Sequence, residues 1–238
     1  AYLKMGFGSD ANYFLDILVS EHPENKYTKW AILLYADTLY NGSKRPQALK
    51  LYEDVLYSAK DLDMASEAAI RLANNRIDQG KVKEAKEYLL KILTANTKFL
   101  IKDEANAYAL AEKLAANKLE DIAAQIGDAL IQTMKRTNEI YEGLLKDIGL
   151  WYGAAHEIEK AYTYLKRYQQ EYKNGEYADV VQQGLDTLFF ELAETNTTKL
   201  NEYYDTLMSR YDNEIKDKAL IEKGKLLLSQ ERYKEVLS

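Results

Sequence analysis

A small residue flanked by large apolar or aromatic residues recurs about every 37 residues along this chain of 238 residues. Successive anchor positions are separated by 37, 37, 38, 38, 39 and 36 residues. The anchors are Ala11, Ala48, Ala85, Ala123, Ala161, Leu200 and Val236. A period of this length, made of paired helices, is typical of a solenoid, in which each repeat buries its apolar face against its neighbours. We therefore predict an all-α fold, a right-handed superhelical solenoid of antiparallel helix pairs.

The composition agrees with helices throughout. Hydrophobic residues make up 47% of the chain, and only 2 prolines and 11 glycines interrupt it. Tyrosine is frequent at 20 residues while phenylalanine is sparse at 5, and a phenol can pack its ring in a thin core and keep its hydroxyl in water. The absence of cysteine excludes disulfides and thiolate metal sites, and fits a bacterial cytoplasm or periplasm. No run approaches the roughly 18 apolar residues of a membrane helix, so we expect no membrane insertion.

The formal charge of −6 is concentrated in one segment. Residues 175–212 contain eight acidic side chains but only Lys199 and Arg210 as basic ones, so this segment alone carries −6. Such a patch would repel phosphate backbones, which argues against a nucleic-acid partner, and would attract a basic protein. The alternative is a solvated helix face with no binding role.

The clearest repeat runs from about residue 138 to 173. Its two helices each place one apolar stripe on one face: Leu145, Ile148, Gly149 and Tyr152 on the first, and Ile158, Ala161, Leu165 and Tyr168 on the second. Gly149 and Ala161 are the small residues that let the two helices approach closely. Three glycines, Gly42, Gly80 and Gly175, fall between helices, where a left-handed residue is useful. We expect helices at about 10–21, 27–41, 44–58, 62–79, 81–95, 100–116, 118–134, 138–155, 157–172, 176–194, 198–211, 214–229 and 231–238.

This pattern resembles the tetratricopeptide repeat, which has a small residue at its eighth position, alanine at its twentieth and a large apolar residue at its twenty-fourth. Ala36, Ala48 and Leu56 illustrate a match that covers essentially the whole chain. Two departures are clear: the period exceeds the family's usual length of roughly 34 residues, and the repeat at 175–212 has Leu188 and Leu200 in the small positions. We interpret residues 1–238 as a single solenoid fragment of about six helix pairs, truncated at both ends.

Residues that would support catalysis or metal binding do not gather in the sequence. The two histidines, His22 and His156, lie 134 residues apart near predicted helix ends, and a solenoid gives them no reason to meet. The segment 6–10 contains two glycines but lacks the preceding strand and the Gly-Lys-Ser/Thr of a phosphate-binding loop. Acidic side chains are abundant, and we assign them to exposed helix faces. We therefore predict no metal site, no cofactor and no catalysis, and a role as a scaffold for protein–protein interaction.

The resemblance also implies where a partner would bind. In tetratricopeptide arrays, ligands contact the first helix of each repeat on the concave face. Carrying those positions over gives the partner-binding candidates Trp30, Asp37, Tyr40, Asn41, Asn74, Asp78, Tyr108 and Glu112. These residues suit a helix or an extended basic segment, and the alternative is that Trp30 and Tyr40 only pack against neighbouring helices. Further along, the same face becomes small and apolar at Leu150, Gly153 and Ala154, which indicates contact with another subunit or tight superhelical closure.

Asn196 is a candidate glycosylation site. It lies in a predicted loop, in a segment that matches the acid-x-Asn-x-Ser/Thr acceptor of some bacterial periplasmic systems, and a chance match is the alternative. Long-period tetratricopeptide-like repeats, tyrosine-rich helices and this sequon are together similar to the paralysed-flagella motility proteins. That resemblance implies a periplasmic scaffold that binds components of the flagellar motor, such as its stator ring. The alternatives are a periplasmic repeat adaptor in envelope assembly and a peptide-sensing regulatory repeat domain, and a cytoplasmic location also stays open.

Overall fold

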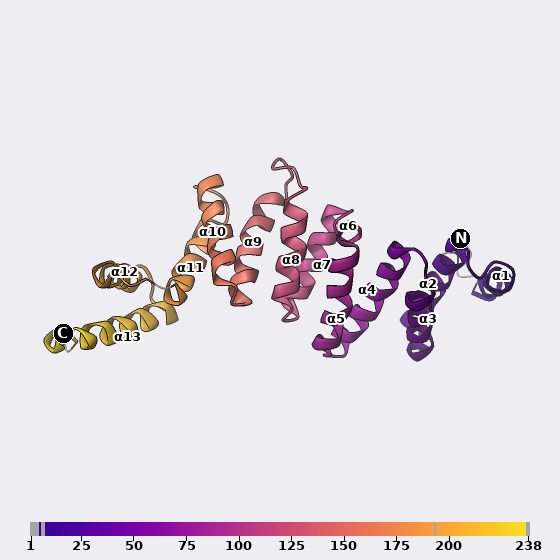
Figure 1. Cartoon of the computed structure of the whole chain (residues 1–238), viewed down its shortest axis with the longest axis horizontal. Coiled ribbons are helices and arrows are strands. Elements are labelled where there is room, and N and C mark those ends of the chain that lie inside the picture. The colour runs from indigo at the N-terminus through magenta and orange to yellow at the C-terminus, as the bar shows by residue number, and fades with distance from the viewer. Residues whose placement is uncertain (1–4, 6–7, 193, 237–238) are drawn as a thin grey trace. The chain divides into compact units, whose positions relative to one another are not determined.

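The computed structural model describes residues 5, 8–192 and 194–236. In this part of the chain every regular element is a helix and no strand occurs (Figure 1), which confirms the all-α prediction. None of the described helices has the length and hydropathy that a bilayer span requires. The elements are α1 (Gly8–Glu21), α2 (Lys26–Asn41), α3 (Arg45–Ser58), α4 (Leu62–Asp78), α5 (Val82–Ala95), α6 (Thr97–Leu100), α7 (Glu104–Ala116), α8 (Glu120–Ile131), α9 (Tyr141–Ala154), α10 (Ile158–Glu171), α11 (Ala178–Leu188), the 3₁₀ helix η2 (Phe189–Glu191), α12 (Thr197–Arg210), α13 (Glu214–Ser229) and α14 (Tyr233–Val236).

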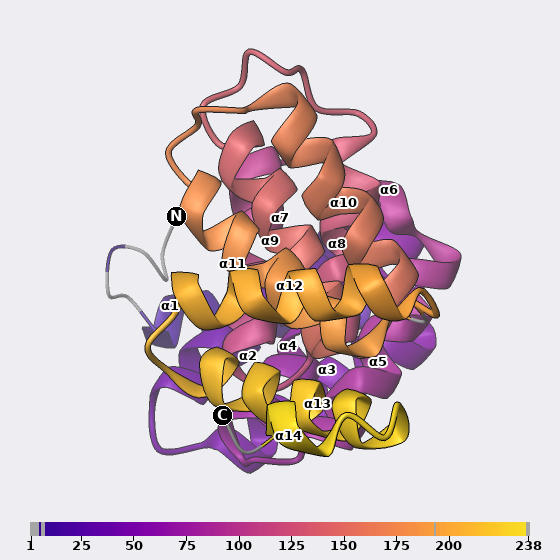
Figure 2. The ribbon, with the colours of Figure 1, turned by 90° about the vertical axis from the view of Figure 1, so that its left-hand side faces the viewer.

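The chain divides into two compact units, residues 1–141 and residues 142–238, which are described separately as the first and second units. In the first unit α2 packs against α3, α4 against α5 and α7 against α8 as consecutive pairs. In the second unit the pairs are α9 with α10, α11 with α12, and α13 with α14. Consecutive pairs there meet where α10 packs against α11, and where α12 and α13 run side by side (Figure 2). The chain is thus an all-α array of consecutive, tetratricopeptide-like helix pairs. That residues 1–238 form one continuous solenoid stays a prediction.

Four of the turns between paired helices share one backbone geometry. A left-handed residue follows the first helix of the pair at Gly80, Lys118, His156 and Glu231, with φ angles of 71°, 62°, 59° and 58°. In each turn the N–H of the next residue bonds to the carbonyl five residues earlier, at 2.7, 3.0, 2.9 and 3.0 Å. This is the Schellman motif, which satisfies carbonyls at a helix C-terminus. Because the four positions are 38, 38 and 75 residues apart, the sequence period is also present in the backbone.

The prediction of a left-handed residue is confirmed at Gly80 and wrong at Gly42 and Gly175. Gly42 ends α2 in an extended conformation, with φ −91° and ψ −154°, and Gly175 does not have a positive φ. Gly175 is instead required for space, because a Cβ there would lie 2.2 Å from Glu142 Oε1 and 2.5 Å from Tyr168 Oη. Its role is close approach of the backbone to a side-chain network.

The small anchor residues lie where helices cross. Ala48, Ala85, Ala123 and Ala161 have no exposed surface. A Cβ on Gly149 would lie only 2.6 Å from Leu165 Cδ2 and 3.2 Å from the backbone nitrogen of the same leucine. The close approach of α9 and α10 therefore depends on glycine at this position, as the periodicity predicts.

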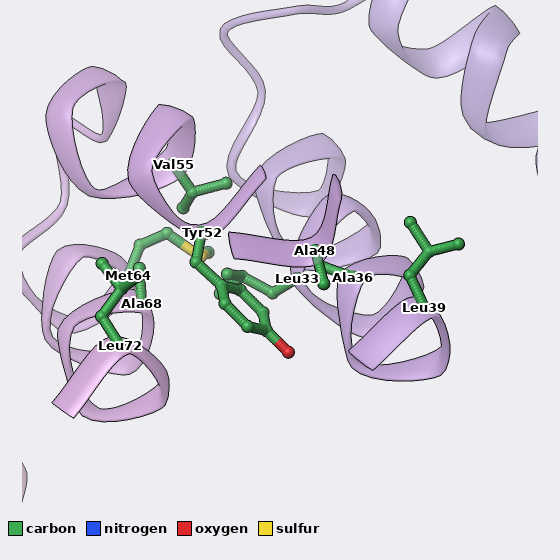
Figure 3. Close-up of a cluster of buried hydrophobic side chains, with 9 residues drawn as sticks. All are labelled: Leu33, Ala36, Leu39, Ala48, Tyr52, Val55, Met64, Ala68 and Leu72. Atoms are coloured by element: carbon green, nitrogen blue, oxygen red, sulfur yellow. The ribbon is translucent and has the colours of Figure 1, made fainter. Parts of the chain in front are cut away.

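Buried side chains join α2, α3 and α4 in one hydrophobic cluster (Figure 3). Leu33 and Leu72 have no exposed surface, and Met64 and Tyr52 are 2% exposed. The ring of Tyr52 lies among the apolar side chains, whereas its hydroxyl oxygen points out of the cluster (Figure 3). This orientation places a polar atom at the edge of the cluster without exposing the ring.

The expected helix at 176–194 is wrong at both ends. α11 ends at Leu188 and is followed by η2, so no long first helix is present in this repeat. The aromatic side chains after Leu188 pack across the connection instead: the ring centroids of Phe189 and Tyr203 are 3.9 Å apart, and the rings of Phe190 and Tyr204 stack at 6.2 Å. This repeat carries Leu200 where the five preceding anchors are alanine, so large side chains fill the connection.

Two other boundaries also differ from expectation. The helix expected at 100–116 is preceded by the separate short helix α6 and begins only at Glu104, where Asp103 caps it. α8 ends at Ile131, and an irregular segment of polar residues leads to α9 at Tyr141.

Candidate functional site

A polar groove lies on the first unit, and we call it the polar groove below. Its volume is about 290 Å³. It is lined by Asp37, Tyr40 and Asn41 of α2, by Tyr52 of α3, and by Arg71, Asn74 and Asp78 of α4. Since α2 and α4 are the first helices of consecutive pairs, the groove lies on the face that the repeat pattern predicts for a partner.

Asp37 is the centre of a hydrogen-bond network that links three helices. Arg71 donates to both carboxylate oxygens, from Nε to Oδ1 at 2.8 Å and from Nη2 to Oδ2 at 3.0 Å. The hydroxyl of Tyr52 donates to Oδ1 at 2.7 Å, and the third nitrogen of Arg71 pairs with Glu67 Oε2 at 2.7 Å. Bidentate pairing of this kind fixes orientation as well as charge, so the network holds α2, α3 and α4 in a defined register.

Tyr40 joins a second network at the other side of the groove. Its hydroxyl donates to Asp78 Oδ2 at 3.1 Å and accepts from Nδ2 of Asn75 at 3.2 Å. Asn75 is only 3% exposed, so this bond satisfies a buried amide. The guanidinium of Arg45 lies 5.1 Å from the centre of the Tyr40 ring, which is within the range of a cation–π contact.

The groove contains charged side chains of both signs, and the cations of Arg45 and Lys113 lie beside it. It is lined by the carboxylates of Asp37 and Asp78 against the single guanidinium of Arg71, which is also shared with Glu67. Burial raises the pKa of Tyr52 well above its usual value of 10, and the hydrogen bond to Asp37 raises it further. Tyr52 therefore remains a neutral donor at physiological pH, and the exposed carboxylate of Asp78 is the group of the groove that can accept a positive charge or a hydrogen-bond donor from a ligand.

The structure brings together five of the eight candidate residues: Asp37, Tyr40, Asn41, Asn74 and Asp78. Trp30 does not line the groove; it is half-buried and packs against the cluster of Figure 3. Tyr108 and Glu112 lie on α7 and do not line this groove either. α7 still reaches the site through Lys113, whose Nζ donates to Asn74 Oδ1 at 2.6 Å.

Two residues of the groove, Tyr52 and Arg71, are absent from the candidates. Tyr52 occupies a core position in the repeat pattern. That pattern does not distinguish a tyrosine whose hydroxyl reaches the groove from one that only packs in the core. Arg71 follows Glu67 by four residues on one helix, and this spacing brings opposite charges together. The spacing is the sequence signal that could have indicated an ion pair at Arg71.

A second buried network contradicts the expectation that acidic side chains belong to exposed faces. Asp186 of α11 has no exposed surface. It accepts hydrogen bonds from Arg210 Nη1 at 2.6 Å and from the hydroxyls of Tyr203 at 2.6 Å and Tyr211 at 2.8 Å, and Gln182 Nε2 donates to it at 2.7 Å. A buried carboxylate requires this kind of pairing, so one of the acids of segment 175–212 is structural.

Asn196 is exposed and immediately precedes α12. Its Oδ1 accepts a hydrogen bond from the backbone N–H of Lys199 at 3.1 Å, so Asn196 is the N-cap of that helix. Thr198, the hydroxyl residue of the sequon, lies in the first turn of α12. The sequon therefore spans the end of the loop and the start of the helix.

Metal-binding geometry does not occur among the described residues, where no three His, Cys, Asp or Glu side chains gather in one place. His156 is 81% exposed and lies 3.5 Å from Glu191 Oε2. It occupies the left-handed position of a helix turn, which accounts for its place near a helix end.

Comparison of the chain with models of protein families finds no match. Comparison with curated protein sequences finds none either. Among solved structures, the chain is similar to a tetratricopeptide repeat protein from Parabacteroides merdae ATCC 43184, with 12% sequence identity and a TM-score of 0.44. The likeness covers 99% of this chain and 85% of that one. The helix pairs and repeated turns of this chain itself define its fold.

Proposed function

We propose that this chain is a non-catalytic scaffold that binds another protein through the polar groove. The observation that carries the proposal is the gathering of five residues, chosen for their repeat positions, around one groove of about 290 Å³. The networks around Asp37 and Tyr40 fix the side chains of the groove before a partner arrives. A site ordered in advance loses less conformational entropy on binding.

The partner segment carries a lysine or arginine side chain. Asp78 is exposed, and it accepts a hydrogen bond from the neutral hydroxyl of Tyr40, so that bond leaves its charge uncompensated. Asn41 and Asn74 add amide groups that suit the backbone of an extended segment. A basic side chain beside Asp78, with its backbone along the two asparagines, uses each of these groups.

The proposal is tested by site-specific photo-cross-linking of the full-length protein in its own cells. The cross-linking residue replaces Asn41 or Asn74 in the groove, and Glu87, which is exposed on α5, provides the control position. We expect the same protein to be captured from both groove positions and not from Glu87. Asp78→Lys should abolish the capture, because it reverses the charge that the partner meets. Equal capture with and without Asp78→Lys would refute binding through this groove.

We further propose that the partner is a component of the flagellar motor and that the chain acts in the periplasm. The support is the long repeat period, the tyrosine content and the acid-containing sequon at Asn196, whose side chain is exposed. The captured protein decides among the alternatives. Stator-ring or other motor components would support the motor scaffold, and envelope-assembly proteins would support the adaptor instead. A free short peptide that binds the polar groove tightly would favour the sensor.

A further inference from the structure

A second groove, of opposite chemistry, lies within the second unit between α9 and α11, and we call it the apolar groove. Its volume is about 330 Å³. Leu150, Gly153 and Ala154 line it from α9, and Val180 and Thr187 line it from α11, with Glu191 at one end. From Val180 to Glu191 the wall spans twelve residues, or about 16 Å at the helical rise. The groove is therefore about three helical turns in length.

Packing accounts for two of the glycines in this groove but not for the third. A Cβ on Gly149 would lie 2.6 Å from Leu165 Cδ2, and one on Gly184 would lie 2.9 Å from Leu150 Cδ2. A Cβ on Gly153 would meet only Leu188 Cδ2 at 3.4 Å and the Cβ of Ala161 at 3.8 Å, which are ordinary contacts. Alanine would fit at position 153, and it favours helices over glycine by about 0.5–1 kcal/mol in a helix interior.

The backbone does not account for Gly153 either, because its φ is not positive. Glycine at this position leaves free volume above the helix, and that volume is part of the apolar groove. A side chain supplied by another molecule would occupy it, and a leucine or methionine side chain has a suitable shape.

The α11 wall defines the charge of the occupant. Residues 175–192 contain the acidic side chains Glu176, Asp179, Asp186 and Glu191 and no lysine or arginine. Asp186 is buried and paired with Arg210, whereas the other three are exposed. On the opposite wall the nearest cation along α9, Lys146, already pairs with Asp147 at 2.7 Å. Glu191 is the one carboxylate among the residues that line the groove, and none of these lining residues is a lysine or arginine. The groove thus combines an apolar floor with an acidic end, which complements a basic amphipathic helix.

We propose that the apolar groove binds an amphipathic helix of a partner protein, about three turns long, with a leucine or methionine side chain over Gly153 and a basic side chain beside Glu191. The helix-in-groove mode buries an apolar stripe between two walls, and α9 and α11 supply such walls. The inference is independent of the polar groove, because the two sites share no residue.

The test uses the full chain and a fluorescein-labelled amphipathic peptide of leucine and lysine, about 15 residues long so that it can form a helix. Binding is followed by fluorescence anisotropy. Two comparison peptides replace every lysine by glutamate or every leucine by alanine. We expect saturable binding of the leucine–lysine peptide and loss of binding for both comparison peptides, since the site requires apolar burial and positive charge together.

Two variants and a matched control locate the binding. Val180→Asp places a charge in the groove, and Leu228→Asp places one on α13 outside it; the two side chains are 46% and 49% exposed. We expect Val180→Asp to weaken binding about tenfold or more, as loss of a buried apolar anchor does, and Leu228→Asp to leave it unchanged. Gly153→Ala should weaken binding while the free energy of unfolding stays the same or rises.

Equal effects of Val180→Asp and Leu228→Asp would overturn the proposal, as would no binding of the leucine–lysine peptide. Equal binding of the alanine–lysine peptide would also overturn it, because attraction between opposite charges would then suffice. Gly153→Ala guards against misfolding as an explanation, since weaker binding by a protein of unchanged stability can only come from the groove. The variant Asp78→Lys, in the other unit, should bind the peptide like the unmodified chain.

Discussion

Two equivalent turns of the first unit carry different residues, Gly80 and Lys118, at the same left-handed position. Substitutions at these two positions test whether the left-handed φ angle itself affects the stability of the unit. Gly80 and Lys118 have φ angles of 71° and 62° and are followed by the same Schellman hydrogen bond, at 2.7 and 3.0 Å. We predict that Gly80→Ala destabilises the first unit and that Lys118→Gly stabilises it. Both effects come from one conformational preference, so they should be similar in size and opposite in sign.

The magnitude follows from the surroundings of Gly80. A Cβ there would have no neighbour within 4 Å, so Gly80→Ala introduces no steric repulsion and only the backbone cost remains. A left-handed L-residue costs about 1–2 kcal/mol, and the greater freedom of glycine in the unfolded chain offsets about 0.5–1 kcal/mol of this. Each exchange should therefore change the free energy of unfolding by about 1 kcal/mol. Lys118→Ala should have almost no effect, because alanine keeps the unfavourable φ.

The assay is urea unfolding monitored by the fluorescence of Trp30, in a background where Trp151 is replaced by phenylalanine. Trp30 is half-buried against the core cluster of the first unit, so its emission reports the unfolding of that unit. Stabilisation by Lys118→Ala as large as that by Lys118→Gly would refute the reasoning, because the effect would then belong to the lysine side chain. Destabilisation by Lys118→Gly would refute it as well.

Three further predictions concern the second unit, and each is checked by urea unfolding followed by circular dichroism. Asp186→Asn should lower the free energy of unfolding by about 2–3 kcal/mol, because Arg210 and two hydroxyls lose a buried carboxylate. A decrease no larger than that caused by a substitution at an exposed position would contradict this. Gly149→Ala should lower the free energy of unfolding by about 1–3 kcal/mol, since the added Cβ would lie 2.6 Å from Leu165 Cδ2. Unchanged stability would show that α9 and α10 can move apart without loss of stability. Burial and the hydrogen bond to Asp186 raise the pKa of Tyr211 from 10 to about 12. The contribution of the neutral Tyr211 to the free energy of unfolding is therefore complete below pH 10 and is lost as the pH rises from 10 through about 12. Tyr211→Phe should therefore flatten the alkaline loss of stability, and an equally steep loss in that variant would exclude Tyr211 as its source.

The sequence predicts the helix pairs well because the small residues that determine them act through local spacing and sterics. Ala48 and Ala161 are buried at helix crossings, as their period requires. The end of α11 is not predictable in this way. Leu188 continues an apolar helical pattern, and the helix stops there because Phe189 and Phe190 pack against tyrosines of α12. Contacts between residues distant in sequence override the local preference.

The same distinction applies to the polar groove. Asp37 and Asp78 lie on the exposed face of first helices, so a position in the repeat is enough to place them. Tyr52 reaches the groove from a core position of α3, and Arg71 reaches it from α4 by pairing with Asp37 of α2. Their role depends on tertiary contacts that a position in the repeat does not reveal. Trp30 shows the converse, because its position matches the binding face while its ring packs against the core.

Three of the 20 tyrosines have a structural role that composition alone misassigns. Three tyrosines on second helices do not keep their hydroxyls in water but donate to acids on the first helix of their own pair: Tyr52 to Asp37 at 2.7 Å, Tyr168 to Glu142 at 2.5 Å and Tyr203 to Asp186 at 2.6 Å. Burial, followed by this bond, raises the pKa of each phenol well above 10. Phenylalanine would fill the same space but leave each acid short of a donor. Because the bond ties the first helix to the second within a pair, it fixes the orientation of the first helix, and first helices line the polar groove in one unit and the apolar groove in the other.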